Sequence, residues 1–275
     1  MGYSCAIVIC LEIGVGLSKK GTLDAKTVFF LGTSNAIPDE YHENSHMVVV
    51  GEQRIVLIDC VDSPILRFKK VGVDFNRLSD LILTHFHPDH VSGVPQLLMN
   101  MWLMGRSLPL NIYGLHHTLD CIEDLMGLYG WSEWPDFFPV VFYRLPAQEM
   151  ISVLECEEFH ILAAPVQHFI PTIGLRIEFL KSKKVLAYSC DTEPCPQVLR
   201  LADGADVLIH EASGPLPGHS SAAQAGKAAA QAVVGALYLI HYPTGQFAAG
   251  DPLSEARTQF EGPVTLAEDF VSLEF

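Results

Sequence analysis

Three histidines and one aspartate lie within six consecutive positions, His85, His87, Asp89 and His90, in the pattern H-x-H-x-D-H. The pattern follows an apolar run that is typical of a buried strand, and Pro88 inside it favours the start of a helix. Neutral imidazole and carboxylate groups are ligands that zinc, manganese and iron(II) accept in proteins. The spacing therefore predicts a metal site at the end of a strand.

Four ligands from one turn do not close easily around a single ion, so the pattern favours two metals that take further ligands from other strand ends. Three candidates stand beside strand-like runs, namely His168, Asp191 and His241. A carboxylate between two divalent ions can bridge them, and ions about 3.5–4 Å apart can stabilise both the attacking and the leaving oxygen of a displacement. The sequence thus predicts a dinuclear hydrolytic centre.

The elements that must position these residues alternate between strand-like and helix-like segments after Lys26. Apolar runs predict strands at residues 27–32, 46–51, 54–60, 78–84, 108–114, 172–180, 184–191, 206–212 and 236–242. Helical spacing predicts helices at residues 63–72, 91–105, 115–130, 196–202 and 220–235. Two βα-rich halves around a middle segment that gives no clear pattern predict one domain of two packed sheets with outer helices.

The helix predicted at 220–235 carries its own boundary signals. Ser221 and Gln224 have the spacing of a capping box, and Gly235 is expected just past the end of the helix. The alanine-rich face of this segment favours close packing on a sheet.

Composition restricts the class of partner and the compartment. The 275 residues include 32 acidic and 17 basic side chains, a formal net charge of −15 that repels polyanions and anionic membranes. Seven scattered cysteines, none spaced C-x-x-C, argue against a disulfide framework and favour a reducing, cytoplasmic setting. The apolar N-terminal run is too short to span a bilayer and contains Glu12, so we interpret residues 1–25 as an extension or an added strand in preference to a secretion signal or anchor.

The order and spacing of these pieces resemble the metallo-β-lactamase superfamily from Thr27 to Phe275. The resemblance implies an α/β (α+β) fold, a four-layer αββα sandwich formed by residues 26–275, with the metals at one edge. It also implies the division of the ligands: His85, His87 and His168 hold one ion, Asp89, His90 and His241 hold the other, and Asp191 bridges them.

Within the superfamily, four stretches resemble ribonuclease Z. They are "FFLGTSNAIP" near the start, "IHEAS" at 209–213, "GHSS" at 218–221 and "FEGPVTLAEDF" near the end. The resemblance implies that Glu211 orients His219, that His219 protonates the leaving oxygen, and that Asp89 helps to activate the attacking hydroxide. The physics allows these roles, because a metal lowers the pKa of water towards about 7 and a helix start just after His219 favours an anionic phosphate.

The chain also departs from ribonuclease Z. Those enzymes carry a basic arm that grips tRNA, whereas residues 116–166 here contain nine acidic residues and only Arg144 as a basic one. The stretches "RFKK" at 67–70 and "KSKK" at 181–184 remain possible phosphate contacts or solvated surface. Three roles are open for the aromatic residues of 129–143: a lid over an apolar substrate group, a contact with a second subunit, or ordinary core and loop packing. Cys190, directly before Asp191, is expected to be a buried and inert thiol.

These observations favour a metal-dependent hydrolase that cleaves phosphodiester bonds with two divalent ions, zinc first and manganese or iron as alternatives. One alternative is a tRNA 3′-end endoribonuclease, although the charge does not support RNA as substrate. A second is a carboxylic ester, lactone or thioester hydrolase, and a third is a non-catalytic metal-binding module. The family resemblance implies a homodimer, and no membrane partner is expected.

Overall fold

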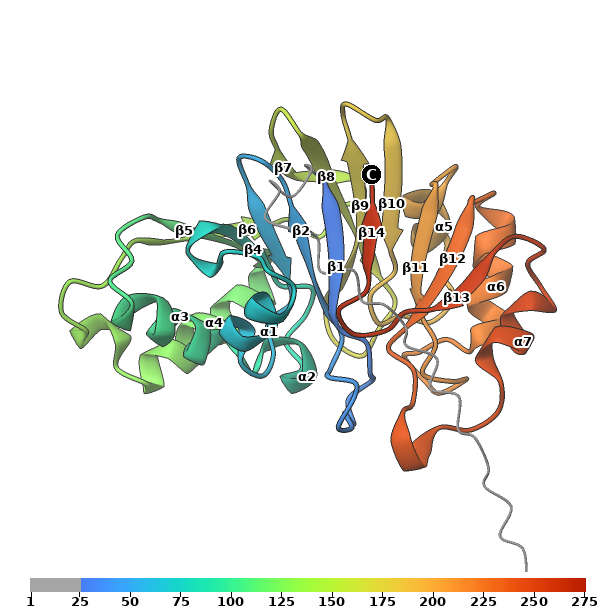
Figure 1. Ribbon diagram of the computed structural model, residues 1–275, viewed down its shortest axis with the longest axis horizontal. Helices are drawn as coiled ribbons and strands as arrows, with labels where there is room; N and C mark the ends of the chain where they lie inside the picture. The colour runs from blue at the N-terminus through green and yellow to red at the C-terminus, as the bar shows by residue number, and fades with distance from the viewer. Residues whose placement is uncertain (1–25) are drawn as a thin grey trace, which may run out of the picture.

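The computed structural model describes residues 26–275, so the predicted N-terminal extension lies outside the described residues. Two seven-stranded sheets face each other at the centre of the molecule (Figure 1). In spatial order the first sheet contains β14 (Ser272–Glu274), β1 (Thr27–Gly32), β2 (His46–Val50), β3 (Ile55–Ile58), β4 (Leu78–Ile82), β5 (Leu110–Leu115) and β6 (Val140–Leu145). Its β14, β1, β2 and β3 pair antiparallel, and β3 to β6 pair parallel.

The second sheet repeats this mixed plan. In spatial order it contains β13 (Val264–Leu266), β12 (Ala236–Ile240), β11 (Val207–Glu211), β10 (Lys184–Tyr188), β9 (Thr172–Phe179), β8 (Phe159–Val166) and β7 (Ile151–Glu155). Strands β13 to β10 pair parallel, and β10 to β7 pair antiparallel. The C-terminal ends of β8, β10, β11 and β12 therefore lie at the same edge of the sheet.

Helices cover the outer face of each sheet (Figure 1). The first sheet carries α1 (Pro64–Lys70), α2 (Pro88–Val91), α3 (Val94–Leu103) and α4 (His116–Leu128), with the 3₁₀ turns η1 (Phe75–Arg77) and η2 (Trp131–Glu133). The second carries α5 (Pro196–Ala202), α6 (Ala222–Gln231) and α7 (Pro252–Arg257), with η3 (Gly245–Phe247) nearby. The order of layers is helix, sheet, sheet, helix.

The pleat of the strands assigns alternate residues to different cores. Along β1, Val28 and Phe30 pack between the two sheets, whereas Phe29 and Leu31 pack against the helices of the first half. A third core, rich in alanine, joins α5, α6 and α7 to the second sheet. Strands buried on both faces read as continuous apolar runs, which is why the sequence pattern located them. The predicted αββα sandwich is confirmed.

One predicted helix boundary is wrong. The capping box of Ser221 and Gln224 is present, but α6 ends at Gln231 with Ala232 as its C-cap. Gly235 therefore does not end the helix. It lies against Asp206, where an added Cβ would come within 2.7 Å of the Asp206 carbonyl oxygen. The glycine is needed for this close approach and not for a helix terminus.

The cysteines of the described residues form no disulfide framework, as the sequence predicted. Five of them, Cys60, Cys121, Cys156, Cys190 and Cys195, are free thiols. Among residues 26–275, no helix is long and apolar enough to cross a membrane.

Candidate metal centre

The structure brings all seven predicted ligands to one edge of the sandwich, the lower edge in Figure 1 near α2. His85 and His87 follow β4, and α2 adds Asp89 and His90. The remaining three ligands lie within three residues of the ends of strands of the second sheet: His168 after β8, Asp191 after β10 and His241 after β12. Because the C-terminal ends of these strands share one edge, residues more than 150 positions apart converge without long loops.

The first group consists of His85, His87 and His168. His87 Nδ1 lies 3.0 Å from His85 Nε2 and 3.1 Å from His168 Nε2. Two nitrogens bound to one tetrahedral zinc ion at the usual bond length are separated by roughly 3.3 Å. Three imidazole nitrogens that approach this closely have the geometry of ligands to one ion.

The second group consists of Asp89, His90, Asp191 and His241. Asp191 Oδ2 lies 3.5 Å from His90 Nε2 and 3.4 Å from His241 Nε2. Asp89 Oδ2 completes the group, at 3.4 Å from His241 Nε2 and 3.6 Å from His90 Nε2.

Asp191 Oδ2 also reaches the first group. It lies 3.9 Å from His85 Nε2 and 4.0 Å from His168 Nε2. One carboxylate oxygen thus stands between the two sets of ligating atoms, which is the position of a bridging ligand.

The buried atoms of this centre fit metal ions better than hydrogen bonds. His90 Nε2 and Asp191 Oδ1 are buried, and neither has a hydrogen-bond partner among the described residues. Burial lowers the pKa of His85 well below its usual value, so its ring is neutral and able to ligate. Although burial opposes it, the surrounding histidines hold the pKa of Asp191 well below its usual range, so this ligand is ionised. Imidazole and carboxylate donors suit zinc, manganese or iron(II).

A second layer of hydrogen bonds fixes the orientation of the imidazole rings. His90 Nδ1 donates to Asp59 Oδ2 at 2.8 Å, and His168 Nδ1 donates to the Gly218 carbonyl oxygen at 2.7 Å. His241 Nδ1 donates to Ser213 Oγ at 2.7 Å, since that hydroxyl itself donates to the His241 carbonyl oxygen. In the neutral form of each ring, this bond places the proton on Nδ1 and leaves Nε2 as the nitrogen able to bind a metal at the centre.

Asp59 is a site residue that sequence reasoning missed. Its carboxylate is fully buried and also accepts bonds from the backbone and hydroxyl of Thr84. Asp59 follows β3 with a φ of 61°, a backbone conformation that aspartate adopts more readily than most residues. The sequence signal that could have identified Asp59 is an acidic residue directly after a wholly apolar strand.

Glu211 and His219 form the pair that the resemblance implied. Glu211 Oε1 accepts a bond of 3.0 Å from His219 Nδ1, and the carboxylate also accepts backbone N–H groups of Thr192, Ser213 and Ser220. The His219 ring centroid lies 5.0 Å from that of His168 and 5.8 Å from that of His241. Burial lowers the pKa of His219, but the bond to Glu211 and the nearby carboxylates raise it above its usual value on balance.

The start of α6 has fewer free backbone N–H groups for a phosphate than the sequence predicted. The Ser220 amide donates to Glu211 Oε1, and the capping box occupies the amides of Ser221 and Gln224. Three of the N–H groups near this helix start are already bonded, so His219 itself is the main polar group there.

In the 67–70 stretch, carboxylates already engage the arginine. Arg67 forms ion pairs with Glu43 and Asp269 at 3.1 and 2.9 Å. Residues 181–184 comprise the turn between β9 and β10 and the first residue of β10, at the end of this strand opposite Asp191, and Lys181 there faces Glu52 at 4.0 Å. The interpretation of both stretches as structural or solvated is the one that the geometry supports.

An exposed aromatic ring, which sequence reasoning did not single out, stands beside the centre. Phe169 follows His168 directly, and 65% of its surface is exposed. Its ring centroid lies 5.2 Å from that of His168 and 6.3 Å from that of His219. The absence of a side chain at Gly218 permits this position, because an added Cβ there would lie 2.7 Å from a Phe169 ring carbon.

The other predicted features have structural roles. The aromatic residues around η2 pack together, with Trp134 stacked on Trp102 of α3 at 4.9 Å, so ordinary packing accounts for these rings. Cys190 is buried with its Sγ 3.7 Å from His85 Nδ1, and burial raises the pKa of its thiol well above the usual value. This agrees with an inert, protonated thiol.

Known proteins resemble this chain over most of its length. The family model of the anti-Pycsar protein Apyc1 matches residues 26–256. The chain belongs to the Apyc1 family. This match covers every candidate ligand as well as Glu211 and His219.

The Apyc1-family chain is also similar to ribonuclease Z. The ribonuclease Z of Mycolicibacterium gilvum is 30% identical, with 88% of this chain and 93% of that protein covered. The enzyme of the same name from Methanothermobacter thermautotrophicus is 26% identical, with 90% and 96% covered. The predicted ribonuclease Z-like hydrolase of the metallo-β-lactamase superfamily is confirmed.

Solved structures agree with the fold. The short form of human tRNase Z superposes with a TM-score of 0.71 at 26% identity, over 90% of this chain and 98% of that one. The metallo-β-lactamase fold protein YhfI from Bacillus subtilis superposes with a TM-score of 0.76 at 21% identity, over 91% and 99%. The Apyc1-family chain is therefore a metal-dependent hydrolase of this superfamily.

Proposed function

We propose that the chain cleaves phosphodiester bonds with two zinc ions, held by the two ligand groups that share Asp191. The observation that carries this proposal is the position of His219, whose ring stands beside both groups while Glu211 fixes its Nδ1. When bound, the ions lower the pKa of water and neutralise charge on phosphoryl oxygens. The similarity to ribonuclease Z supports a phosphodiester as the substrate class.

The roles of the protein groups follow from their positions. Asp89, about one-eighth exposed, is an acceptor that can orient the attacking water and take up its proton. His219 presents Nε2 to the leaving oxygen and supplies it with a proton, because Nδ1 is bonded to Glu211. Glu211 is a positioning residue: it touches no substrate and holds His219 and the loops around it.

We infer that the substrate is a small phosphodiester, not precursor tRNA. The formal net charge is −15, Arg67 is ion-paired with Glu43 and Asp269, and residues 181–184 lie at the end of β10 opposite Asp191. Binding of a long polyanion depends on Lys and Arg contacts with phosphates. Phe169 supplies an exposed aromatic face beside the centre instead, on which a planar base or aryl group of a small diester can stack.

The test of this proposal compares two substrates at low salt on one metal-loaded preparation. We expect turnover of bis(p-nitrophenyl) phosphate and of a dinucleotide, with precursor tRNA left uncut. Specific cleavage of precursor tRNA at its 3′ end would contradict the small-substrate proposal and favour the endoribonuclease. Hydrolysis of p-nitrophenyl acetate or a lactone without any diesterase activity would favour the carboxylic ester alternative.

We also propose a cytoplasmic homodimer. Free cysteines fit a reducing compartment, and the dimer follows the expectation that the family resemblance gave. The surface of α3 and α4 offers exposed apolar side chains for such a contact, among them Leu103 and Leu128. Light scattering on the purified chain distinguishes a dimer from a monomer by mass.

A further inference from the structure

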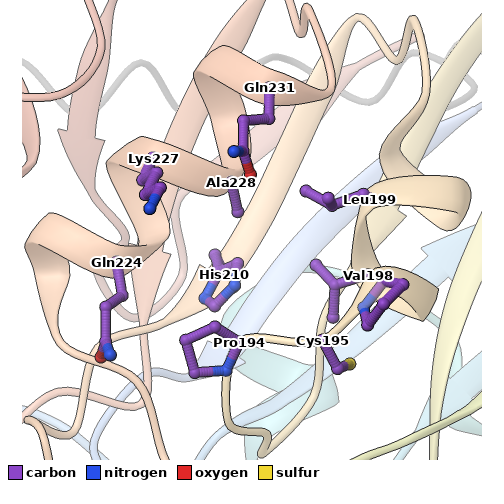
Figure 2. A pocket seen from close by; sticks show the side chains of 10 residues that line it. Pro194, Cys195, Val198, Leu199, His210, Gln224, Lys227, Ala228 and Gln231 are labelled. Carbon is purple, nitrogen blue, oxygen red and sulfur yellow. The ribbon is translucent and has the colours of Figure 1, made fainter.

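A separate pocket lies on the outer face of the second sheet, between α5 and α6 (Figure 2). Its volume is about 360 Å³, which is within the range of small-molecule sites. Figure 2 shows His210 of β11 between the two helices, with Val198 and Leu199 on the α5 side and Lys227 on the α6 side. No candidate metal ligand lines this pocket.

His210 places an unusual polar atom in this pocket. Along β11, Leu208 and His210 point towards the helices, where the surrounding layer is apolar and rich in alanine. The His210 side chain is 1% exposed, and its Nδ1 lies 2.8 Å from the Glu211 carbonyl oxygen. A carbonyl oxygen only accepts, so Nδ1 carries the proton of the neutral ring and Nε2 is a bare acceptor. Among the described residues, none donates a hydrogen bond to Nε2.

A positive charge and hydrogen-bond donors lie at the rim of the pocket. Lys227 is the one charged side chain among the described residues that line it, in a protein whose formal net charge is −15. Gln224 Oε1 accepts the Ser221 amide, so the Gln224 amide NH₂ remains able to donate. The pocket thus combines apolar walls, one buried acceptor, and donors and a positive charge at its mouth.

We propose that this pocket binds a small amphiphilic anion. Its apolar body packs against Val198 and Leu199, a hydroxyl or N–H group donates to His210 Nε2, and its carboxylate or equivalent anionic group pairs with Lys227. The site lies on the side of β11 that faces α5 and α6, behind the Glu211–His219 pair. It is distinct from the metal centre and goes beyond the proposed phosphodiesterase activity.

The test uses three probes that differ by one group, titrated into the full chain by calorimetry. We use 4-hydroxyphenylacetate, which has all three features, phenylacetate, which lacks the donor, and 4-hydroxyphenylacetamide, which lacks the charge. We expect saturable binding of the first probe, about fivefold or more tighter than either of the others. In two-dimensional NMR spectra, the amide signals of residues 224–231 should shift during this titration.

Variants assign the binding to the pocket. Lys227→Met should abolish the preference for the carboxylate over the amide, whereas Lys69→Met, on the exposed face of α1, should leave all three affinities unchanged. Ala228→Phe fills the pocket and should abolish binding in a folded protein. Equal affinities for the three probes, no binding at millimolar concentrations, or unchanged binding in Lys227→Met would each overturn the proposal. None of these results depends on metal or turnover, so they are independent of the phosphodiesterase test.

Discussion

His219 Nδ1 lies 3.0 Å from Glu211 Oε1, and this bond connects a buried carboxylate to a ring that stands beside both groups of metal ligands. The bond fixes which nitrogen of His219 faces the substrate. It also links β11 to the loop before α6, because the same carboxylate accepts the Ser213 and Ser220 amides.

The first prediction concerns proton donation by His219. His219→Ala should lower kcat on phosphodiesters by about 10²–10⁴-fold, the usual contribution of a positioned general acid. The loss should be smaller for bis(p-nitrophenyl) phosphate than for thymidylyl-thymidine, because p-nitrophenolate leaves without protonation more easily than an alkoxide. Steady-state kinetics on both substrates at equal metal content measure the difference.

His117→Ala is the matched control for this experiment, because His117 is an exposed histidine of α4 and should not affect turnover. An equal loss for both substrates in His219→Ala would show that His219 acts in some way other than protonation of the leaving oxygen.

A second prediction concerns Asp59, which orients His90 without reaching the centre itself. Asp59→Asn should weaken metal binding by about 10–100-fold, the usual effect of removing a carboxylate that holds a ligating histidine. Zinc titration against a chromophoric chelator measures this loss. Asp80→Asn is the control: Asp80 is also a buried carboxylate, but it pairs with Arg54 at 2.8 Å away from the ligands. We expect unchanged zinc affinity in the control, and a loss of affinity as large as that of Asp59→Asn would contradict the specific role.

Phe169 gives a third prediction. Phe169→Ala should lower kcat/KM for thymidylyl-thymidine by roughly 5- to 150-fold through a higher KM, since stacking of one base on an aromatic ring contributes about 1–3 kcal/mol. Phe247→Ala removes a half-exposed phenylalanine of η3 and should change nothing. Metal content should be unaffected in both variants. If Phe169→Ala kept the wild-type KM, the ring would have no part in substrate binding.

Burial of His46 makes the fold sensitive to acid. Burial, opposed by a hydrogen bond to the Asn44 carbonyl oxygen, lowers the pKa of His46 from 6.5 to about 4. The unfolded chain therefore takes up a proton near pH 6.5 and the folded chain only near pH 4, so stability falls as the pH decreases through this window. The total loss is about 3 kcal/mol at 1.36 kcal/mol per pKa unit.

His46→Asn tests this, because asparagine keeps a donor for the Asn44 carbonyl oxygen and does not titrate. Urea unfolding of chelator-treated protein between pH 4 and 7 should show a shallower pH dependence in His46→Asn than in the wild type. Parallel curves for the two proteins would rule out His46 as a source of acid sensitivity.

The fold was predictable because strands buried on both faces and the alanine-rich α6 leave strong local signals. The pattern around His85 located the centre, and strand ends located Asp191 and His241. What the sequence did not reveal depends on contacts between distant segments. Asp59 becomes a site residue only because β3 and β4 are neighbours, and the position of the Phe169 ring depends on a close approach to Gly218 that the sequence does not show.

Local signals also misled where they had a second physical cause. Gly235 resembled a helix terminus but serves a close approach to Asp206. The helix start after His219 resembled a phosphate site, yet Glu211 and the capping box occupy its amides. In both cases the residue type indicated a special backbone position, but its actual partner comes from a segment that only the tertiary structure brings close.

The central claim is that two ligand groups sharing Asp191 hold two metal ions for phosphodiester cleavage. Elemental analysis of the purified chain, followed by bis(p-nitrophenyl) phosphate turnover with and without chelator, tests it most directly. We predict two equivalents of divalent metal per chain, with turnover that is lost to the chelator and restored by zinc. A chain that retains at most one equivalent, or turnover that resists chelation, would contradict the account.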